Sequence, residues 1–526
     1  MKPLPADQER TLLALRPFAR ARLSVAAGAL AAMKPVLGRS AALCALLCCW
    51  AAQASAQEQG SVEERLRKLE ERQAAQDQEL KEKDARIREL EGEVATAKDP
   101  LDQRPVVPVD AGSAKMAVAA PPNSVMQEIV DRYQDGIVIW QTDADAKVPF
   151  LLKYNINSQV RYLNTTSAKD TFTDHLGVVR EVNQRNDITV NRTMFILGGY
   201  IFDPRLRYSS TVWTSSGAAS IVIAGNIGWQ FDKAFTLTAG YTGVPGSRSL
   251  VNTFPFFQST DRTMADNFFR PGFTQGIWAS GALPYNLNYL AFVGNGLNTL
   301  NISAAKIDEN LTYSGSLWWE PLGDYGPPGK SRNMYDDYFA TPDLRIRLGT
   351  SFTSSREDRF SNLDTSSPEN TSMYNSDGVL TFSTGAFAPD VTVQEATYRM
   401  WAIDGGMKWN GWSVNGQYYF RWVDDFFADG PIPVTDMYDH GYELSAAGFI
   451  IPRTLMVYGR SSQVWGEFRD SWEAAIGAKW YFVPTERMWL TAELMRTVKV
   501  PYSGTFTPYT AGMTAWVPMV QAVLAF

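Results

Sequence analysis

The chain has 526 residues, a formal net charge of -7 and an aromatic content of 12%. Its acidic balance gives no sign of nucleic-acid binding, so nucleic acid is excluded as a predicted partner. After residue 56 no uninterrupted apolar run reaches the roughly 18 residues that a membrane-spanning helix needs.

Residues 1–56 are predicted to be a signal peptide. Residues 41–56 read AALCALLCCWAAQASA, an apolar stretch ending in a small-x-small cleavage pattern. Met33 begins a basic flank of ordinary size and is a possible true start; one long signal is the alternative. A lipoprotein signal is disfavoured because Leu47, which is not small, precedes Cys48. The three cysteines all lie in this segment, so an exported chain that starts at Gln57 contains none.

Residues 57–99 are predicted to form a coiled coil. With Leu66 at heptad position a, seven of the ten a and d positions between Val62 and Val94 are apolar. The polar exceptions weaken its middle, and a lone charged helix is the alternative. A coiled coil needs partner helices, so the pattern predicts an oligomer. Residues 100–148 contain several prolines and are predicted to be a linker.

From residue 149 onward the apolar period changes to two. In residues 153–162 an apolar row with aromatic ends alternates with a wholly hydrophilic row, and residues 412–422 and 472–482 repeat the alternation. The last strand, which ends at Phe526, has one almost wholly apolar face with an aromatic at each end. Repeated alternation with aromatic borders predicts that residues 149–526 form an all-β transmembrane barrel.

The predicted barrel has about sixteen antiparallel strands, joined by alternating short turns and long loops. Two segments do not fit. Residues 322–342 are long where a short turn is needed, and in 187–202 the charged Arg192 shares a parity with Met194. The predicted strands are 149–163, 187–202, 205–214, 219–231, 233–243, 274–283, 286–295, 311–321, 343–354, 395–409, 411–423, 440–450, 454–463, 471–482, 488–499 and 514–526.

Short motifs in this region resemble the phosphate-selective porin O and P family. They are NRTMF (191–195), GGYIFD (198–203), LTAGY (237–241), FRPGFTQG (269–276), FVGNG (292–296), GAKWY (477–481) and VQAVLAF (520–526). The resemblance covers roughly 149–526. It implies a sixteen-stranded homotrimeric pore with loops folded inward, and some related porins also carry an N-terminal coiled coil.

A lipid-facing Arg or Lys costs about 2–4 kcal/mol at mid-membrane, so charges in mid-strand are expected to point into the lumen. The expected inward acids are Asp404, Glu443, Glu473 and Glu493. An excess of inward cations over these acids makes the lumen favour anions. The alternative is that the cations pair with the acids and stiffen the wall. Arg270 can equally brace its own loop. The predicted pore-lining or anion-binding residues are Lys153, Arg161, Arg205, Arg207, Arg248, Arg262, Arg270, Arg345, Arg347, Lys408, Arg421 and Lys479.

Enzyme chemistry is not expected. The only histidines after the predicted signal peptide are His175 and His440, and no nucleophile with a supporting motif lies beside them in the sequence. No Cys/His cluster offers a metal site. No cofactor is predicted.

The sequence thus predicts a porin of the bacterial outer membrane for small hydrophilic solutes, preferring anions such as phosphate. Its expected partners are small anionic solutes, outer-membrane lipid and copies of itself, with the coiled coil in the periplasm and in possible contact with peptidoglycan. The alternatives are a channel for sugars or dicarboxylates, and a plugged structural barrel that tethers the membrane to the cell wall.

Overall fold

In each alternating strand one face suits lipid and the other suits the lumen. The sheet closes on itself, which puts the first face outside and the second inside. A computed structural model describes residues 133–526 except 134, 144, 216–219, 252, 300–306, 308, 327–333, 360–372 and 505. The predicted signal peptide, coiled coil and most of the predicted linker lie outside the described residues. Among those described, no helix has the length and apolar character to cross a bilayer.

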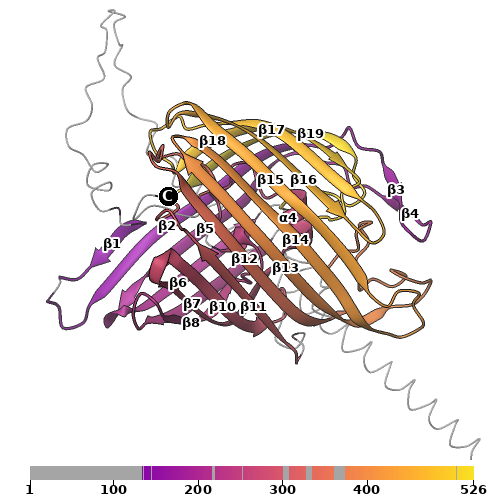
Figure 1. Cartoon of the computed structure of the whole chain (residues 1–526), viewed down its shortest axis with the longest axis horizontal. Coiled ribbons are helices and arrows are strands. Elements are labelled where there is room, and N and C mark those ends of the chain that lie inside the picture. Colours follow the sequence, from indigo (N-terminus) through magenta and orange to yellow (C-terminus); the bar gives the residue numbers. More distant parts are fainter. Residues whose placement is uncertain are drawn as a thin grey trace, which may run out of the picture. The chain divides into compact units, whose positions relative to one another are not determined.

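Sixteen antiparallel strands form the closed barrel, and they follow the chain around the ring (Figure 1). All sixteen predicted strands are present, with shifts of a few residues at their ends. They are β2 (Phe150–Asn164), β5 (Asn186–Ile201), β6 (Asp203–Ser215), β7 (Ser220–Gln230), β8 (Thr236–Gly243), β9 (Phe273–Leu283), β10 (Leu287–Asn295), β11 (Leu311–Trp319), β12 (Arg345–Asp358), β13 (Val393–Trp409), β14 (Trp412–Ala428), β15 (Met437–Ile451), β16 (Leu455–Trp465), β17 (Ser471–Trp480), β18 (Met488–Val498) and β19 (Ala515–Ala525).

The barrel closes where the last strand meets the first. Strand β19 pairs with the later half of β2, and Phe526 and Ile156 exchange two backbone hydrogen bonds of 2.8 and 3.0 Å. A seventeenth strand, β1 (Ile137–Gln141), pairs with Leu151–Tyr154 of β2 and so continues the edge that β19 leaves. Strand β1 lies inside the range predicted as linker. The two partners together keep the edge of β2 paired, as a strand in hydrocarbon requires.

Side chains alternate between the two faces of the wall as predicted. On β17, Trp472, Ile476 and Trp480 are exposed on the outside, whereas Glu473 and Ala475 are buried inside. The outer row of β19 is likewise apolar, from Trp516 to Leu524. An apolar outer band with aromatic borders is what a lipid-facing barrel surface needs.

The irregular parity of strand β5 has a structural cause. Gln159 of β2 lies opposite Arg192, but the next residue, Val160, lies opposite Val190, so Asn191 is an extra residue in the ladder. Such a bulge switches which parity faces the lumen. Val190 therefore points outward while Arg192 and Met194 share the inner face.

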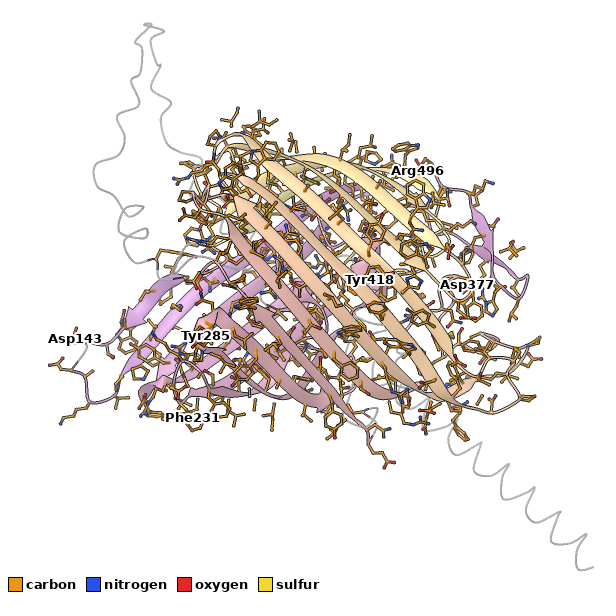
Figure 2. All side chains as sticks on the ribbon, viewed as in Figure 1. Asp143, Phe231, Tyr285, Asp377, Tyr418 and Arg496 are labelled. Carbon is orange, nitrogen blue, oxygen red and sulfur yellow. The ribbon has the colours of Figure 1, made fainter. Side chains whose placement is uncertain are left out.

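The two ends of the barrel differ. Figure 2 shows Asp143, Phe231 and Tyr285 at the end with short turns, where η2 (Pro284–Asn286) lies, and Asp377 and Arg496 at the end with long loops. At the long-loop end a hairpin is formed by β3 (Thr171–Thr173) and β4 (Val179–Glu181).

Long loops fold into the lumen and cover part of the wall. The constriction loop, residues 244–272, contains η1 (Arg248–Leu250) and α4 (Met264–Phe269), and α4 packs on β14, β15 and β16. With segments 373–392 and 500–513 it buries an apolar part of the inner wall. Residues of this internal core include Phe269, Phe382, Met400, Tyr419, Tyr502 and Met519. An apolar inner face was not expected for a water-filled lumen; it exists because these loops cover it.

The long connection 322–342 enters the barrel from the short-turn end. One described part of it, the inward turn of residues 334–341, places Asp336 3.1 Å from Lys479 Nζ and packs Tyr338 against Tyr481. Tyr335 meets the constriction loop, since its backbone N–H donates to the carbonyl of Phe256. This connection is long because it fills part of the lumen.

Candidate permeation site

Open space in the barrel lies off centre, against the inner faces of β5 to β9. One cavity of about 330 Å³, here called the arginine cavity, lies between these strands and the constriction loop. A second of about 550 Å³, the vestibule, lies nearer the short-turn end. The opposite wall is covered by the internal core and the inward turn, so these two spaces form the candidate path for solutes.

A buried carboxylate holds the constriction loop to the wall beside the arginine cavity. Asp261 accepts hydrogen bonds from Arg161 of β2 at 2.7 Å and from Arg192 of β5 at 3.0 Å. Burial alone would raise the pKa of Asp261, but the attraction of Arg192, Arg161 and Arg262 outweighs it and holds that pKa below the ordinary value. One charged carboxylate therefore serves two guanidinium groups.

Arg262 enters the same space from the constriction loop. Its guanidinium lies over the rings of Phe257 and Phe254, at 4.8 and 5.8 Å from their centroids, and its Nε donates to Ser249 Oγ. Burial and repulsion from Arg270 lower the pKa of Arg262 to about 10, so it stays charged at neutral pH.

The lining of the arginine cavity is positive and partly apolar. Arg192 and Arg262 are its charged residues, and no acidic side chain lines it among the residues described. Trp213, Phe254 and Phe273 supply ring surfaces. Asp261, 3.0 Å from Arg192, and Asp266, 3.5 Å from Arg262, are the counter-charges of these groups but do not line the open space. An anion in the cavity therefore meets the two guanidinium groups and not the carboxylates.

Eight of the twelve predicted lining cations lie within 4 Å of a carboxylate, and four of these are wall residues in buried pairs. Arg347 bonds Asp404 at 3.1 Å, Arg421 bonds Asp439 at 2.5 Å, Lys479 bonds Asp336 at 3.1 Å, and Arg161 bonds Asp261 as above. All four cations are buried. These pairs correspond to the alternative in which cations and acids stiffen the wall.

Of the expected inward acids, Asp404, Glu473 and Glu493 are buried and Glu443 is half-buried. Glu473 and Glu493 accept from Arg460 at 3.0 and 2.7 Å, while Glu443 accepts from Thr263 Oγ1 at 2.5 Å. Arg460 was missed by the parity argument, because β16 shows no strong alternation around it.

Five further predicted cations lie apart from the arginine cavity. Arg248 packs between the rings of Tyr325 and Tyr335, and Lys408 lies over Tyr325. Arg270 contacts Asn267 of its own loop, the bracing role left open above. Arg205 pairs with Asp203 and Arg345 with Asp343, both at the rim of the barrel.

The last two predicted cations line the vestibule. Lys153 and Arg207 face this space together with Asp135, and Lys153 Nζ lies 3.4 Å from the carbonyl oxygen of Asp135. The vestibule is therefore of mixed charge, unlike the arginine cavity.

Arg192 is the functional residue that the parity argument left out. Its side chain lies between the rings of Phe254 and Phe506, at 5.4 and 5.7 Å. The parity argument missed it because the bulge at Asn191 puts the apolar Val190 and the charged Arg192 on opposite faces although they share a parity.

The two histidines have positions that do not suggest catalysis. His175 Nδ1 lies 2.6 Å from Asp377 Oδ2 and its ring stacks on Phe468 in the long loops. His440 lies among exposed rings on the outer face of the wall, bonded to Tyr418 (Figure 2). No group of three or more His, Cys, Asp or Glu residues suited to a metal occurs in the part of the chain that the structure describes.

Solved structures similar to this chain are bacterial outer-membrane proteins. OmpT of Vibrio cholerae is 9% identical, with a TM-score of 0.44 over 73% of this chain and 99% of its own. The anion-selective porin from Comamonas acidovorans is 11% identical, with a TM-score of 0.42 over 72% and 99%. The channel DcaP of Acinetobacter baumannii is 8% identical, with a TM-score of 0.40 over 74% and 100%. No protein-family model and no characterised protein matches the sequence.

Proposed function

We propose that this chain is a porin of the bacterial outer membrane through which small solutes diffuse, with a preference for anions. The observation that carries the proposal is the arginine cavity, where Arg192 and Arg262 face open space without an acid in the described lining. At an effective dielectric near 20, one unit charge about 4 Å from an anion contributes up to roughly 4 kcal/mol. Asp261 and Asp266 offset part of this attraction, and the part that remains at the open face of the two guanidinium groups sets the proposed ion preference.

The setting of the proposed porin follows from barrel architecture. Short turns face the periplasm and long loops the outside in such barrels, so the vestibule would open to the periplasm. Phosphate as the solute, a homotrimer, and a periplasmic coiled coil that contacts peptidoglycan stay predictions of the sequence and of its resemblance to the phosphate-selective porins.

A reversal-potential measurement tests the proposal. The purified chain is placed in a planar bilayer under a potassium chloride gradient, and we expect a potential of the sign for chloride preference. Replacing both cavity arginines by glutamine (R192Q with R262Q) should move it toward zero. The matched control, Arg205→Gln at the rim, should leave it unchanged. Cation preference of the unaltered chain would refute the proposal, and absence of conductance would favour the plugged structural barrel.

A further inference from the structure

The wall beside the arginine cavity is not sealed. Strand β7 pairs with β6 along its length, up to Ser220 opposite Ser215, but its described pairs with β8 run only from Gln230–Thr236 to Asn226–Gly240. Strand β8 continues to Gly243 in register with β9. The residues of β7 before Asn226 therefore diverge from β8 on the long-loop side of this ladder.

The ladder ends at a glycine for a steric reason. Gly240 has φ of +137°, and a Cβ there would lie 2.3 Å from the carbonyl oxygen of Gly225. The absence of a side chain lets the two strands cross closely at this point and then separate. Tyr241, the next residue, lies in the space between them.

A third cavity of about 320 Å³ occupies this separation. It shares Val222, Ala224 and Tyr241 with the arginine cavity. Ile223 also lines it, whereas Gln275 and Thr299 make its other side polar, so its apolar surface lies on β7. Val222 is buried on the inside of the barrel, whereas Ile223 is 77% exposed on the outside. The third cavity thus joins the arginine cavity to the outer, apolar surface of the wall.

The two spaces together have a charged end and an apolar end. Arg192 and Arg262 lie at one end of the arginine cavity, and Trp213 adds an indole N–H without a hydrogen-bond partner in the described structure. Val222 and Ile223 lead from there toward the lipid side. This order of donors followed by apolar surface matches a molecule with an anionic head and a linear apolar tail.

We infer that the arginine cavity binds amphipathic monocarboxylates, with the carboxylate at Arg192 and Arg262 and the alkyl chain directed into the gap between β7 and β8. This inference rests on the proposed function and names a solute class for it. An inorganic anion uses the arginines alone, whereas an alkyl carboxylate also removes apolar surface from water. Affinity should therefore rise with chain length.

The test is block of the chloride current through the full chain in a planar bilayer at pH 8 by acetate, butanoate and hexanoate. Burial of a methylene group corresponds to about a fourfold gain in affinity, so each added methylene should lower the blocking concentration by up to about fourfold. Val222→Asn should flatten this dependence. Ile196→Asn, an apolar-to-amide change in the vestibule, is the matched control and should keep the dependence.

The result for the unaltered chain decides the inference even if a variant does not assemble. Equal block by acetate and hexanoate in a chloride-preferring channel would overturn the amphipathic site alone. A cation-preferring channel would instead overturn the proposed function. A chain-length dependence that survives in Val222→Asn would refute the gap as the place of the alkyl tail.

Discussion

Asp261 joins three parts of the barrel through one carboxylate: β2, β5 and the constriction loop. Its replacement by asparagine (D261N) leaves Arg161 and Arg192 without their shared counter-charge. Breaking a buried pair from one side costs about 3–5 kcal/mol, so we expect lower thermal stability, measured by circular dichroism in detergent. The remaining channels should prefer chloride more strongly. Asp203→Asn, at an exposed pair, should change neither property.

Asp261 also predicts how the constriction loop responds to acid. Its pKa is held below the ordinary value of 3.8, so its stabilising effect is complete above about pH 4 and is lost as pH falls through the lowered value. Channel recordings should therefore keep the same conductance from about pH 6.5 to about pH 4.5 and become noisier only below the ordinary carboxyl range. Loss of the steady conductance near pH 6 would contradict this assignment.

At the scale of elements, the constriction loop is held from both ends of the barrel. Tyr335 of the inward turn lies 4.3 Å under the guanidinium of Arg248 and 5.9 Å from the ring of Phe257. Losing these contacts through Tyr335→Ala should cost about 1–2 kcal/mol. That cost raises the population of the displaced loop about five- to thirtyfold. Single-channel records should show more visits to a higher conductance. Tyr285→Ala, at an exposed turn, is the control.

The hairpin of β3 and β4 is held at the long-loop end by hydrogen bonds between His175 and Asp377, one from the backbone N–H of His175 at 2.9 Å and one at its ring at 2.6 Å. Burial would raise the pKa of Asp377, but its bonds to His175 lower it. The bonds between His175 and Asp377 are therefore expected to hold the hairpin at neutral pH and to weaken as pH falls below about 4. Asp377→Asn should release the hairpin at pH 7, seen as faster proteolysis within residues 165–185. Unchanged proteolysis would show that other contacts of the hairpin, such as the stacking of His175 on Phe468, are enough to hold it.

The strands were predictable from the sequence because each obeys one local rule, a period of two between lipid and lumen. The lumen contents were not, since they depend on contacts between distant segments. By parity alone Arg421 points inward, as a pore-lining cation does. Only the fold shows that Asp439 on the next strand pairs with it at 2.5 Å. The apolar inward side chain of Met400 contradicted a hydrophilic lumen, and the covering loops explain it.

At the scale of the whole molecule, the proposed function requires the outer face of the barrel to contact lipid. Ile476, on the outer face of β17, is 69% exposed, and its neighbours Ala475 and Gly477 in the chain do not share that face. Ile476→Arg should lower the free energy of unfolding in lipid vesicles by about 2–4 kcal/mol if this position lies near mid-membrane. Phe231→Arg, at the short-turn end, should cost only about 0–1 kcal/mol because it lies near the interface.

The comparison of these two variants separates lipid from water as the outer environment. Both side chains are apolar and exposed, since Phe231 is 54% exposed, so a barrel surrounded by water would tolerate either arginine equally. A depth-dependent cost arises only when a charge must be placed inside a low-dielectric layer. If both variants have equal and small effects in a denaturant titration, the outer face of the barrel does not contact lipid. The proposed channel function would then be refuted, whereas the closed sheet would not be affected.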